Sequence, residues 1–337
     1  MALLEIFIPT YNRPRELSKC LLSIKKTFLR LSNKNKQKVG LVIRNNSNKY
    51  HSEYKKIINL YSKFFKKKKK NIAYFEYIFT GFNIGSVNNT IGGLFSAKAK
   101  YVWFLPDDDV ARFDSIPILL SSIKKYNPSF LSGGCVKKSL IKRYTSNHIS
   151  NDDKKTNKIL DITYDKSKIE KFLLSGNTVQ AQEYVYKVEI LKKFINQDSN
   201  IELINYMHPG LLAIYCLQKN YPFIRFEKSI GIFRQGNHQD AEWRHLWWKF
   251  ALIDWPILSE KMYKKKWLNK NETEISKRVF THIFRYLSWR IDILLGLNIK
   301  SKVNPWLLLK YHGYFYILAL LSSPLSIIKE LSKRLIK

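Results

Sequence analysis

The sequence predicts an α/β fold, with a Rossmann-like, mostly parallel sheet flanked by helices and followed by a helical, aromatic-rich C-terminal extension. Two observations predict the sheet: short apolar runs alternate with segments of helical spacing between Leu3 and Asp109, and polar clusters follow three of these runs. The extension is predicted because the chain becomes aromatic and helical in pattern beyond about Gly236. We therefore expect one domain over residues 1–235, and over 236–337 a second part that is a candidate for membrane association.

The first strand and the first helix have the clearest patterns. The apolar run from Leu3 to Ile8, which ends at a proline, is typical of a buried parallel strand. Residues 10–13 follow as a loop, and a second proline stands where a helix begins, with Asn12 or Arg13 near its cap. Apolar residues at spacings of three and four give this helix one buried face: Leu17, Leu21, Ile24, Phe28 and Leu31.

The alternation of strands and helices continues through the acidic triplet. Further strands are expected at Val39–Ile43, Ile72–Phe79 and Tyr101–Leu105, and further helices at about Ser52–Phe65, Ser86–Ala97 and Phe113–Ser122. The lysine run between the second helix and the third strand is expected to be a solvated loop. Parallel strands place their carboxyl ends at one edge of a sheet, so three polar clusters are expected to converge there: Thr10–Arg13, Asn45–Ser47 and Asp107–Asp109.

The middle of the chain has a weaker pattern. From about Ser132 to Ile169 it is polar and weakly periodic, which predicts a mobile loop over the site. A helix is expected over Pro209–Leu217. For the tryptophans that follow, core packing or interfacial anchoring is favoured over stacking on sugars: Trp243, Trp247, Trp248 and Trp255.

The C-terminal tail contains an uncharged stretch from Gly313 to Ile328, which Pro324 interrupts and which is short for a helix that spans a bilayer. Lysine and arginine residues flank this stretch on both sides. This combination favours helices that lie in the plane of a membrane interface. The alternative is a buried C-terminal helix that caps the domain.

The net charge of +33, from 59 Lys+Arg against 26 Asp+Glu, first suggests nucleic-acid binding. However, 46 of the basic residues are lysine, whereas base recognition favours the planar fork of arginine. The lysines are also spread along the chain, and no RNP-like, zinc-finger or helix-turn-helix signature accompanies them. We therefore expect no nucleic-acid partner, and we retain attraction to an anionic membrane surface as an open possibility.

The cysteine pattern predicts a reducing compartment. Cys20, Cys135 and Cys216 form no CxxC pair, and such a sparse, odd set argues against a disulfide framework or a structural zinc site. The N-terminal residues have neither the basic region nor the long apolar region of a signal peptide. We expect a cytoplasmic protein, with a peripheral position on the inner face of the plasma membrane as an open alternative.

Three consecutive carboxylates, Asp107, Asp108 and Asp109, follow the fourth apolar run. Like charges at this spacing raise one another's pKa unless a cation lies between them. Mg²⁺ and Mn²⁺ prefer oxygen ligands, and Mg²⁺ commonly takes one or two carboxylates and completes its shell with water and substrate phosphates. The alternative is a solvated acidic turn that caps the next helix. The strand before the triplet and the two other polar clusters favour the metal.

Two motifs in this chain resemble those of family 2 glycosyltransferases, which have the GT-A fold. Ile8-Pro9-Thr10-Tyr11-Asn12-Arg13 before a helix resembles the opening of that family. Asn83-Ile84-Gly85 at a helix start, with the run from Tyr101 to Asp109, resembles its nucleotide-sugar region and DxD motif. The resemblance covers about residues 3–112 well and 170–235 loosely, and it extends thinly to branches that transfer deoxysugars, such as abequosyltransferases.

The resemblance implies a nucleotide-diphospho-sugar donor and Mg²⁺ or Mn²⁺ as cofactor. The residues that it implies for donor binding are Pro9, Thr10, Tyr11, Asn12, Arg13, Asn45, Asn83, Gly85, Asp107 and Asp108, and those for the metal are Asp109, Asp107 and His238. The family usually has an aspartate where this chain has Asn45. An amide still offers a nucleobase one donor group and one acceptor.

The general base is the least determined part of the site. Inverting transfer needs a group that accepts the proton of the acceptor hydroxyl, and the family usually supplies an aspartate from a Glu-Asp pair at a helix start. The matching helix here begins after His208 without that pair, so His208 is the first candidate. Asp240 is the second candidate and Glu183 a weaker one. For each of them, an ordinary capping or surface role is the alternative.

Together these features predict the metal-dependent transfer of a hexosyl or deoxyhexosyl group, with inversion. The expected acceptor is a hydroxyl of a cell-surface glycan or of a lipid-linked oligosaccharide. Two alternatives stay open: a basic nucleic-acid-binding protein, and a degenerate transferase that binds the donor without turnover, because the Glu-Asp pair is missing and Asn45 replaces an aspartate.

Overall fold

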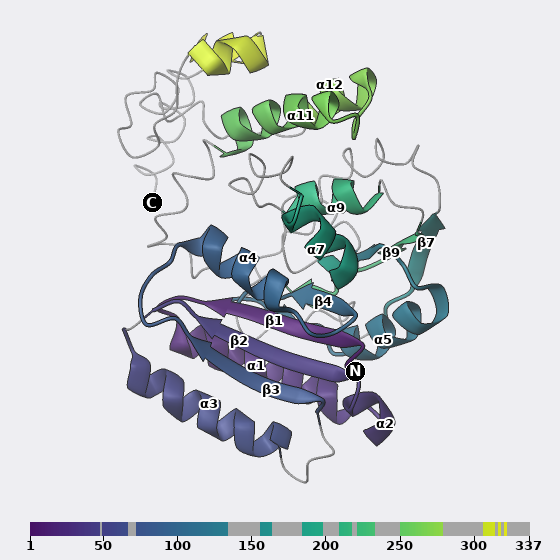
Figure 1. The fold of residues 1–337 in the computed structure, drawn as a ribbon. Helices are drawn as coiled ribbons and strands as arrows, with labels where there is room; N and C mark the ends of the chain where they lie inside the picture. The colour runs from purple at the N-terminus through teal and green to yellow at the C-terminus, as the bar shows by residue number, and fades with distance from the viewer. Residues whose placement is uncertain are drawn as a thin grey trace, which may run out of the picture. The chain divides into compact units, whose positions relative to one another are not determined.

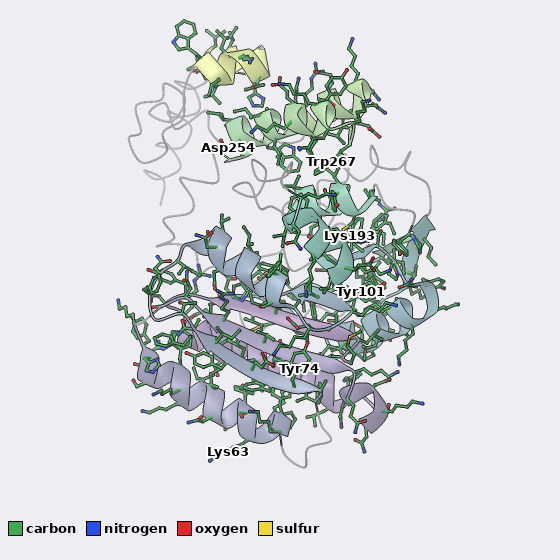
Figure 2. All side chains as sticks on the ribbon, in the orientation of Figure 1. Lys63, Tyr74, Tyr101, Lys193, Asp254 and Trp267 are labelled. Carbon is green, nitrogen blue, oxygen red and sulfur yellow. The ribbon has the colours of Figure 1, made fainter. Side chains whose placement is uncertain are left out.

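The computed structural model describes residues 1–47, 49–66, 72–133, 156–163, 184–197, 209–217, 221–232, 250–278, 306–313, 316–317 and 320–321 (Figures 1 and 2). The chain divides into two units. One comprises Met1–Lys168 and Asn177–Asn237, and the other comprises Ile169–Gly176 and His238–Lys337.

A mostly parallel sheet lies at the centre of the first unit (Figure 1). In the described part of the chain it has eight strands in the order β3-β2-β1-β4-β8-β6-β9-β7. Their bounds are β1 Leu4–Thr10, β2 Val39–Asn45, β3 Tyr74–Phe79, β4 Tyr101–Phe104, β6 Phe130–Ser132, β7 Ile159–Thr163, β8 Tyr184–Lys187 and β9 Phe223–Phe226. The pairs β1–β2, β2–β3, β1–β4 and β6–β9 are parallel, and the others are antiparallel. The predicted fold class is therefore confirmed.

Helices cover both faces of the sheet (Figure 1). On one face lie α1 (Pro14–Leu29), α3 (His51–Lys66) and α5 (Ser115–Tyr126), whose apolar side chains share a core with β1, β2 and β4. On the other face lie α4 (Ser86–Ser96), α7 (Val188–Ile195) and α9 (Pro209–Leu217). Smaller elements are α2 (Asn33–Lys36) and the two-stranded pair of β5 (Val110–Ala111) with β10 (Gly231–Ile232). The predicted apolar face of α1 is buried.

The first strand is longer than the sequence predicts, because it continues through Pro9 to Thr10. Odd-numbered backbone groups of β1 face β4, as the hydrogen bond from the Leu105 amide to the Phe7 carbonyl shows (3.0 Å). β4 pairs with β1 only as far as Phe7. The N–H that Pro9 lacks would therefore point beyond the end of β4, and the proline breaks no hydrogen bond of the sheet.

Two glycines let α4 lie close to the sheet. A Cβ atom on Gly93 would overlap the ring of Phe7, which is fully buried on β1. A Cβ atom on Gly92 would meet only the guanidinium end of Arg44, a half-buried and flexible side chain on β2. This close approach explains why a helix contains adjacent glycines despite their low helix propensity.

Alanine at these two positions should have opposite effects on stability. We expect Gly93→Ala to lower the free energy of unfolding by about 1–3 kcal/mol, since the added methyl group must displace a packed ring. We expect Gly92→Ala, its matched control, to be neutral or to stabilise by up to about 1 kcal/mol through helix propensity, because the Arg44 head can move aside. Urea denaturation measures both, and equal effects would contradict this packing.

A buried carboxylate, that of Glu5, lies at the amino-terminal edge of the sheet. Glu5 on β1 accepts hydrogen bonds from the Tyr74 hydroxyl (2.5 Å) and from the Lys98 backbone amide (2.9 Å). The Tyr74 ring, labelled in Figure 2, occupies the space that a side chain at Gly40 would need. Burial raises the pKa of Glu5, although the Tyr74 and Lys98 hydrogen bonds oppose this shift. We call these residues the Glu5 latch.

The expectation of a loop from about Ser132 to Ile169 is wrong for one segment. Residues Ile159–Thr163 form β7, which pairs antiparallel with β9. This strand is short and lies within a polar stretch of sequence, so its own pattern is weak, and its partner lies far along the chain. Residues 134–155 and 164–183 lie outside the described part, so the rest of this prediction is not addressed.

The second unit is helical in its described part, as predicted. It contains the π-helical turn η6 (Phe250–Asp254), α11 (Trp255–Lys264), α12 (Lys270–Arg278) and helical residues 306–313. Trp255 is fully buried, and its indole N–H donates to the Ser276 carbonyl (3.1 Å), so this tryptophan packs in a core. The other three predicted tryptophans lie outside the described residues. Across the described ranges, no helix is both long enough and apolar enough to cross a bilayer.

Candidate functional site

The three predicted polar clusters meet at the carboxyl edge of the sheet. Thr10 lies opposite Asn45 in the parallel pairing of β1 with β2, and the acidic triplet follows β4 on the other side of β1. The Asn46 backbone amide donates to the Thr10 carbonyl (3.0 Å), which extends the pairing beyond the strand end. The predicted convergence therefore holds in the structure.

The first and third clusters are joined by direct side-chain contacts. The Thr10 hydroxyl donates to one oxygen of Asp107 (2.6 Å). The Arg13 guanidinium contacts Asp108 at 2.6 Å and the second oxygen of Asp107 at 3.5 Å. All three carboxylates of the triplet are buried, whereas the Arg13 side chain keeps 30% of its surface exposed. A solvated acidic turn, the alternative interpretation of the sequence, does not describe these residues.

The surroundings of Asp107 disfavour its ionised form. Burial raises the pKa of Asp107 to about 7, and the neighbouring Asp108 adds to the shift. Arg13 and the Thr10 hydroxyl lower this pKa without cancelling the effect. A divalent cation would favour the ionised form, so oxygen ligands of this kind fit Mg²⁺ or Mn²⁺. Within the described segments no group of three or more His, Cys, Asp or Glu side chains could hold a metal by itself.

The second cluster connects β2 to the loop after β3. The Asn46 side chain donates to the Asn83 side chain (2.9 Å) and accepts from the Ile84 backbone amide (2.8 Å). Asn83 in turn accepts from the Gly85 amide (2.9 Å), and Gly85 has φ +82°, a conformation that glycine adopts without strain. Asn83 and Gly85 are exposed at the start of α4, the helix end at which the helix dipole favours an anion.

Asn45 does not present its amide to the site. Its side chain is fully buried; the nitrogen donates to the Tyr77 hydroxyl (3.0 Å) and the oxygen accepts from the Ser47 amide (3.1 Å). Both ends of the amide are thus engaged by the protein. Direct contact of Asn45 with a nucleobase stays a prediction, and it would require these bonds to rearrange.

The remaining predicted residues lie in the loop between β1 and α1, at the end of β1 and in the turn after β4. Asn12 adopts φ +56°, and its side chain is hydrogen-bonded to the Ser47 hydroxyl of the second cluster. Tyr11 beside it is exposed, while Pro9 is half-buried within β1. Asp109 lies in a turn, with its amide donating to the Pro106 carbonyl (3.1 Å). This loop therefore borders both the acidic cluster and the second cluster.

The candidates for acid–base chemistry and the histidine predicted as a metal ligand are not among the described residues. His208, Asp240, His238 and Glu183 lie outside the described residues, so their predicted roles remain predictions.

The structure adds Tyr54, on α3, to the site. Its hydroxyl lies within hydrogen-bond distance of the Thr10 hydroxyl (2.9 Å) and accepts from the Arg13 backbone amide (2.8 Å). Burial raises the pKa of Tyr54 well above its usual value, so the hydroxyl stays protonated. In the sequence, Tyr54 shares its helical spacing with buried Ile58, Tyr61 and Phe65, and therefore has the pattern of a core residue.

Such a sheet, with buried carboxylates and polar loops at its carboxyl edge, has the architecture of the GT-A fold of glycosyltransferases. The chain belongs to glycosyl transferase family 2, whose family model matches residues 5–178, more than half of the sequence. None of the curated proteins matches this chain. The enzyme class and the fold expected from the opening motif and the acidic triplet are thereby confirmed.

Among the solved structures that share this fold are several of S. aureus TarS. S. aureus TarS 1–349 has a TM-score of 0.57 at 12% identity, over 94% of this chain and 81% of that chain. The same TarS fragment in complex with UDP-GlcNAc gives a TM-score of 0.55 at 13% identity over the same shares. A longer TarS structure gives 0.52 at 12% identity, and there the match covers 94% of this chain and 49% of the TarS chain. Identities this low show the fold alone.

Proposed function

We propose that this enzyme transfers a hexosyl or deoxyhexosyl group from a nucleotide-diphospho-sugar to a hydroxyl of a cell-surface glycan or lipid-linked oligosaccharide, with inversion. The observation that carries the proposal is the buried acidic cluster beside Thr10 and Arg13, at the strand ends where α/β sheets bind ligands. The TarS complex with UDP-GlcNAc supports a nucleotide-sugar donor, because that protein has the same fold.

The cofactor that we propose is Mg²⁺ or Mn²⁺, held by Asp107 and Asp109, with His238 as a further predicted ligand. When bound, the cation would neutralise the charge that develops on the departing nucleotide diphosphate. The raised pKa of Asp107 supports this assignment, because burial disfavours the ionised carboxylate and a bound cation would favour it.

The protein's own groups would position the donor. We place the base and ribose against Pro9, Thr10 and Tyr11, with the diphosphate close to the exposed Asn83–Gly85 turn, at the positive end of the α4 dipole. Arg13 would contribute a fixed positive charge beside the acidic cluster. His208, or alternatively Asp240, would accept the proton of the acceptor hydroxyl.

A donor panel tests the proposal. Purified enzyme is incubated with UDP-, GDP- and dTDP-sugars and a mixture of glycan acceptors, with Mn²⁺ or with EDTA, and nucleotide release is measured. We expect one donor class to give release that depends on both Mn²⁺ and acceptor. Release that EDTA leaves unchanged would overturn the metal, and no release with any donor would overturn the transfer. If oligonucleotides raise the melting temperature more than donors do, nucleic-acid binding becomes the better hypothesis.

We further propose that the C-terminal helix contacts an anionic membrane. The helical residues 306–313 bury Leu308 and His312, and His312 is bonded through its ring to the Leu252 carbonyl (2.7 Å). Apolar side chains nevertheless remain exposed on and after this helix: Trp306, Leu309, Ile317 and Leu321. Residues 301–337 contain six Lys or Arg and a single acidic residue. Apolar surface among basic residues is typical of interfacial helices.

Vesicle flotation tests this contact. We expect the enzyme to float with phosphatidylglycerol vesicles and not to float with phosphatidylcholine vesicles. Trp306→Ser should lose its binding to phosphatidylglycerol vesicles. Phe95→Ser is the matched control, because Phe95 is an exposed aromatic residue of the first unit. Equal flotation of the two variants would contradict the assignment of the contact to this helix.

A further inference from the structure

One buried hydroxyl group, from outside the predicted motifs, is linked to the acidic cluster through Thr10. Tyr54 belongs to α3, and its ring packs in the core shared by β1, β2 and α1. Its hydroxyl, at the far end of the ring, contacts the Thr10 hydroxyl and the Arg13 backbone amide. A phenylalanine would fill the same core position, so packing alone does not explain the hydroxyl.

The donor and the acceptor of each hydrogen bond around this hydroxyl can be assigned. The Arg13 N–H can only donate, so the Tyr54 oxygen accepts it (2.8 Å). Thr10 donates its single proton to the Asp107 carboxylate (2.6 Å). The Thr10 oxygen must therefore accept the proton of Tyr54 at 2.9 Å. The result is a one-way chain from the Arg13 amide through Tyr54 and Thr10 to Asp107.

This chain of hydrogen bonds ends at one oxygen of Asp107. Thr10 engages Oδ2, while the Arg13 guanidinium approaches Oδ1 at 3.5 Å. A carboxylate that is held at one oxygen has a fixed plane, and a fixed plane determines where the other oxygen points. Groups that orient metal ligands in this way affect metal affinity although they never touch the ion.

We propose that Tyr54 is a positioning residue, which orders the Thr10 hydroxyl so that the Asp107 carboxylate keeps the orientation needed at the donor and metal site. This inference rests on the proposed function, because it takes Asp107 to be part of that site. It predicts that removing the Tyr54 hydroxyl weakens metal activation without changing the shape of the core.

The test compares two tyrosine-to-phenylalanine variants of the same helix. Tyr61 is also buried in α3, but its hydroxyl donates to the Ser18 carbonyl (3.0 Å), away from the site. Donor turnover is measured against Mn²⁺ concentration for the wild type, Tyr54→Phe and Tyr61→Phe, together with melting temperatures. We expect Tyr54→Phe to raise the Mn²⁺ concentration for half-activation about 10-fold or more, and Tyr61→Phe to leave it within about twofold.

Thr10 variants provide the second measurement. Thr10→Val interrupts the same chain of hydrogen bonds one step closer to Asp107, so we expect it to raise the Mn²⁺ requirement as Tyr54→Phe does. The double variant Tyr54→Phe/Thr10→Val should need no more Mn²⁺ than Thr10→Val alone. Thr10→Ser restores the hydroxyl and should recover most of the lost affinity. Equal Mn²⁺ requirements for Tyr54→Phe and Tyr61→Phe, with an active wild type, would overturn the positioning role alone. A wild type without metal-dependent turnover would overturn the proposed function and this inference together.

Discussion

Replacing Asp107 with asparagine is expected to lower donor turnover by about 100-fold or more, and at the same time to remove a pH dependence of stability. The first effect follows from the proposed metal role, since loss of a carboxylate ligand should cost at least as much as loss of its supporting groups. The second follows from burial, which raises the pKa of Asp107 from 3.8 to about 7.

The direction of the pH effect is determined by linkage. A carboxyl group whose folded-state pKa is raised binds its proton more tightly in the folded state than in the unfolded state. It therefore contributes stability that is fully present below about pH 4 and is lost as the pH rises through about 7. In Asp107→Asn without metal, this loss should disappear, so the variant should equal or exceed the wild type in stability at pH 8.

The Glu5 latch provides the matched control. Glu5 is a second buried carboxylate with a raised pKa, but it lies at the opposite edge of the sheet. Glu5→Gln should also flatten the dependence of stability on pH, while donor turnover stays near that of the wild type. Thermal denaturation in EDTA between pH 4 and pH 8, together with the nucleotide-release assay, measures both. If Asp107→Asn kept its turnover, the metal assignment would be wrong.

Replacing Arg13 with glutamine is expected to destabilise the metal-free enzyme by about 1–3 kcal/mol. Removing one partner of a fully buried ion pair costs about 3–5 kcal/mol, and the partial exposure of the Arg13 side chain reduces this figure. The loss should increase with pH, because Asp107 then loses the proton that would otherwise neutralise it.

Metal should rescue the Arg13 variant. A divalent cation at the acidic cluster supplies positive charge near the two carboxylates that the guanidinium contacts, so Mn²⁺ should restore more stability to Arg13→Gln than it adds to the wild type. Arg15→Gln is the control, because Arg15 is exposed in the first turn of α1, which follows Arg13 directly. A stability deficit that Mn²⁺ leaves unchanged would show that Arg13 and the metal do not act on the same charge.

The first half of the fold was predictable because β1, β2 and β4 are buried on both faces. Such strands appear as continuous apolar runs, and β1, β2, β3 and β4 each begin or end within about two residues of the expected bounds. The strands β6, β7 and β8 have three to five residues each and pair with partners far along the chain. Short segments of this kind have no periodicity that separates them from loops.

The sequence predicted that the polar clusters meet at one edge of the sheet, but not which of their atoms are in contact. Topology alone places strand ends together, so the convergence of Thr10 and Asp107 could be expected from the sequence. Which atoms meet depends on tertiary packing. Asn45 follows a strand as expected, yet its amide bonds Tyr77 and Ser47, whereas Tyr54 has the spacing of a core residue and carries its hydroxyl into the site.

The Glu5 latch also determines where this enzyme can be engineered. An insertion beside Gly40 or Lys98 would expose a buried carboxylate or displace the Tyr74 ring, and would lower stability before it altered activity. Residues 11–13, 46–47 and 80–85 occupy loops at the opposite edge, beyond the ends of β1, β2 and β3. Libraries that aim to change the choice of donor can therefore be confined to these loops, and the residues of the Glu5 latch can be left unchanged.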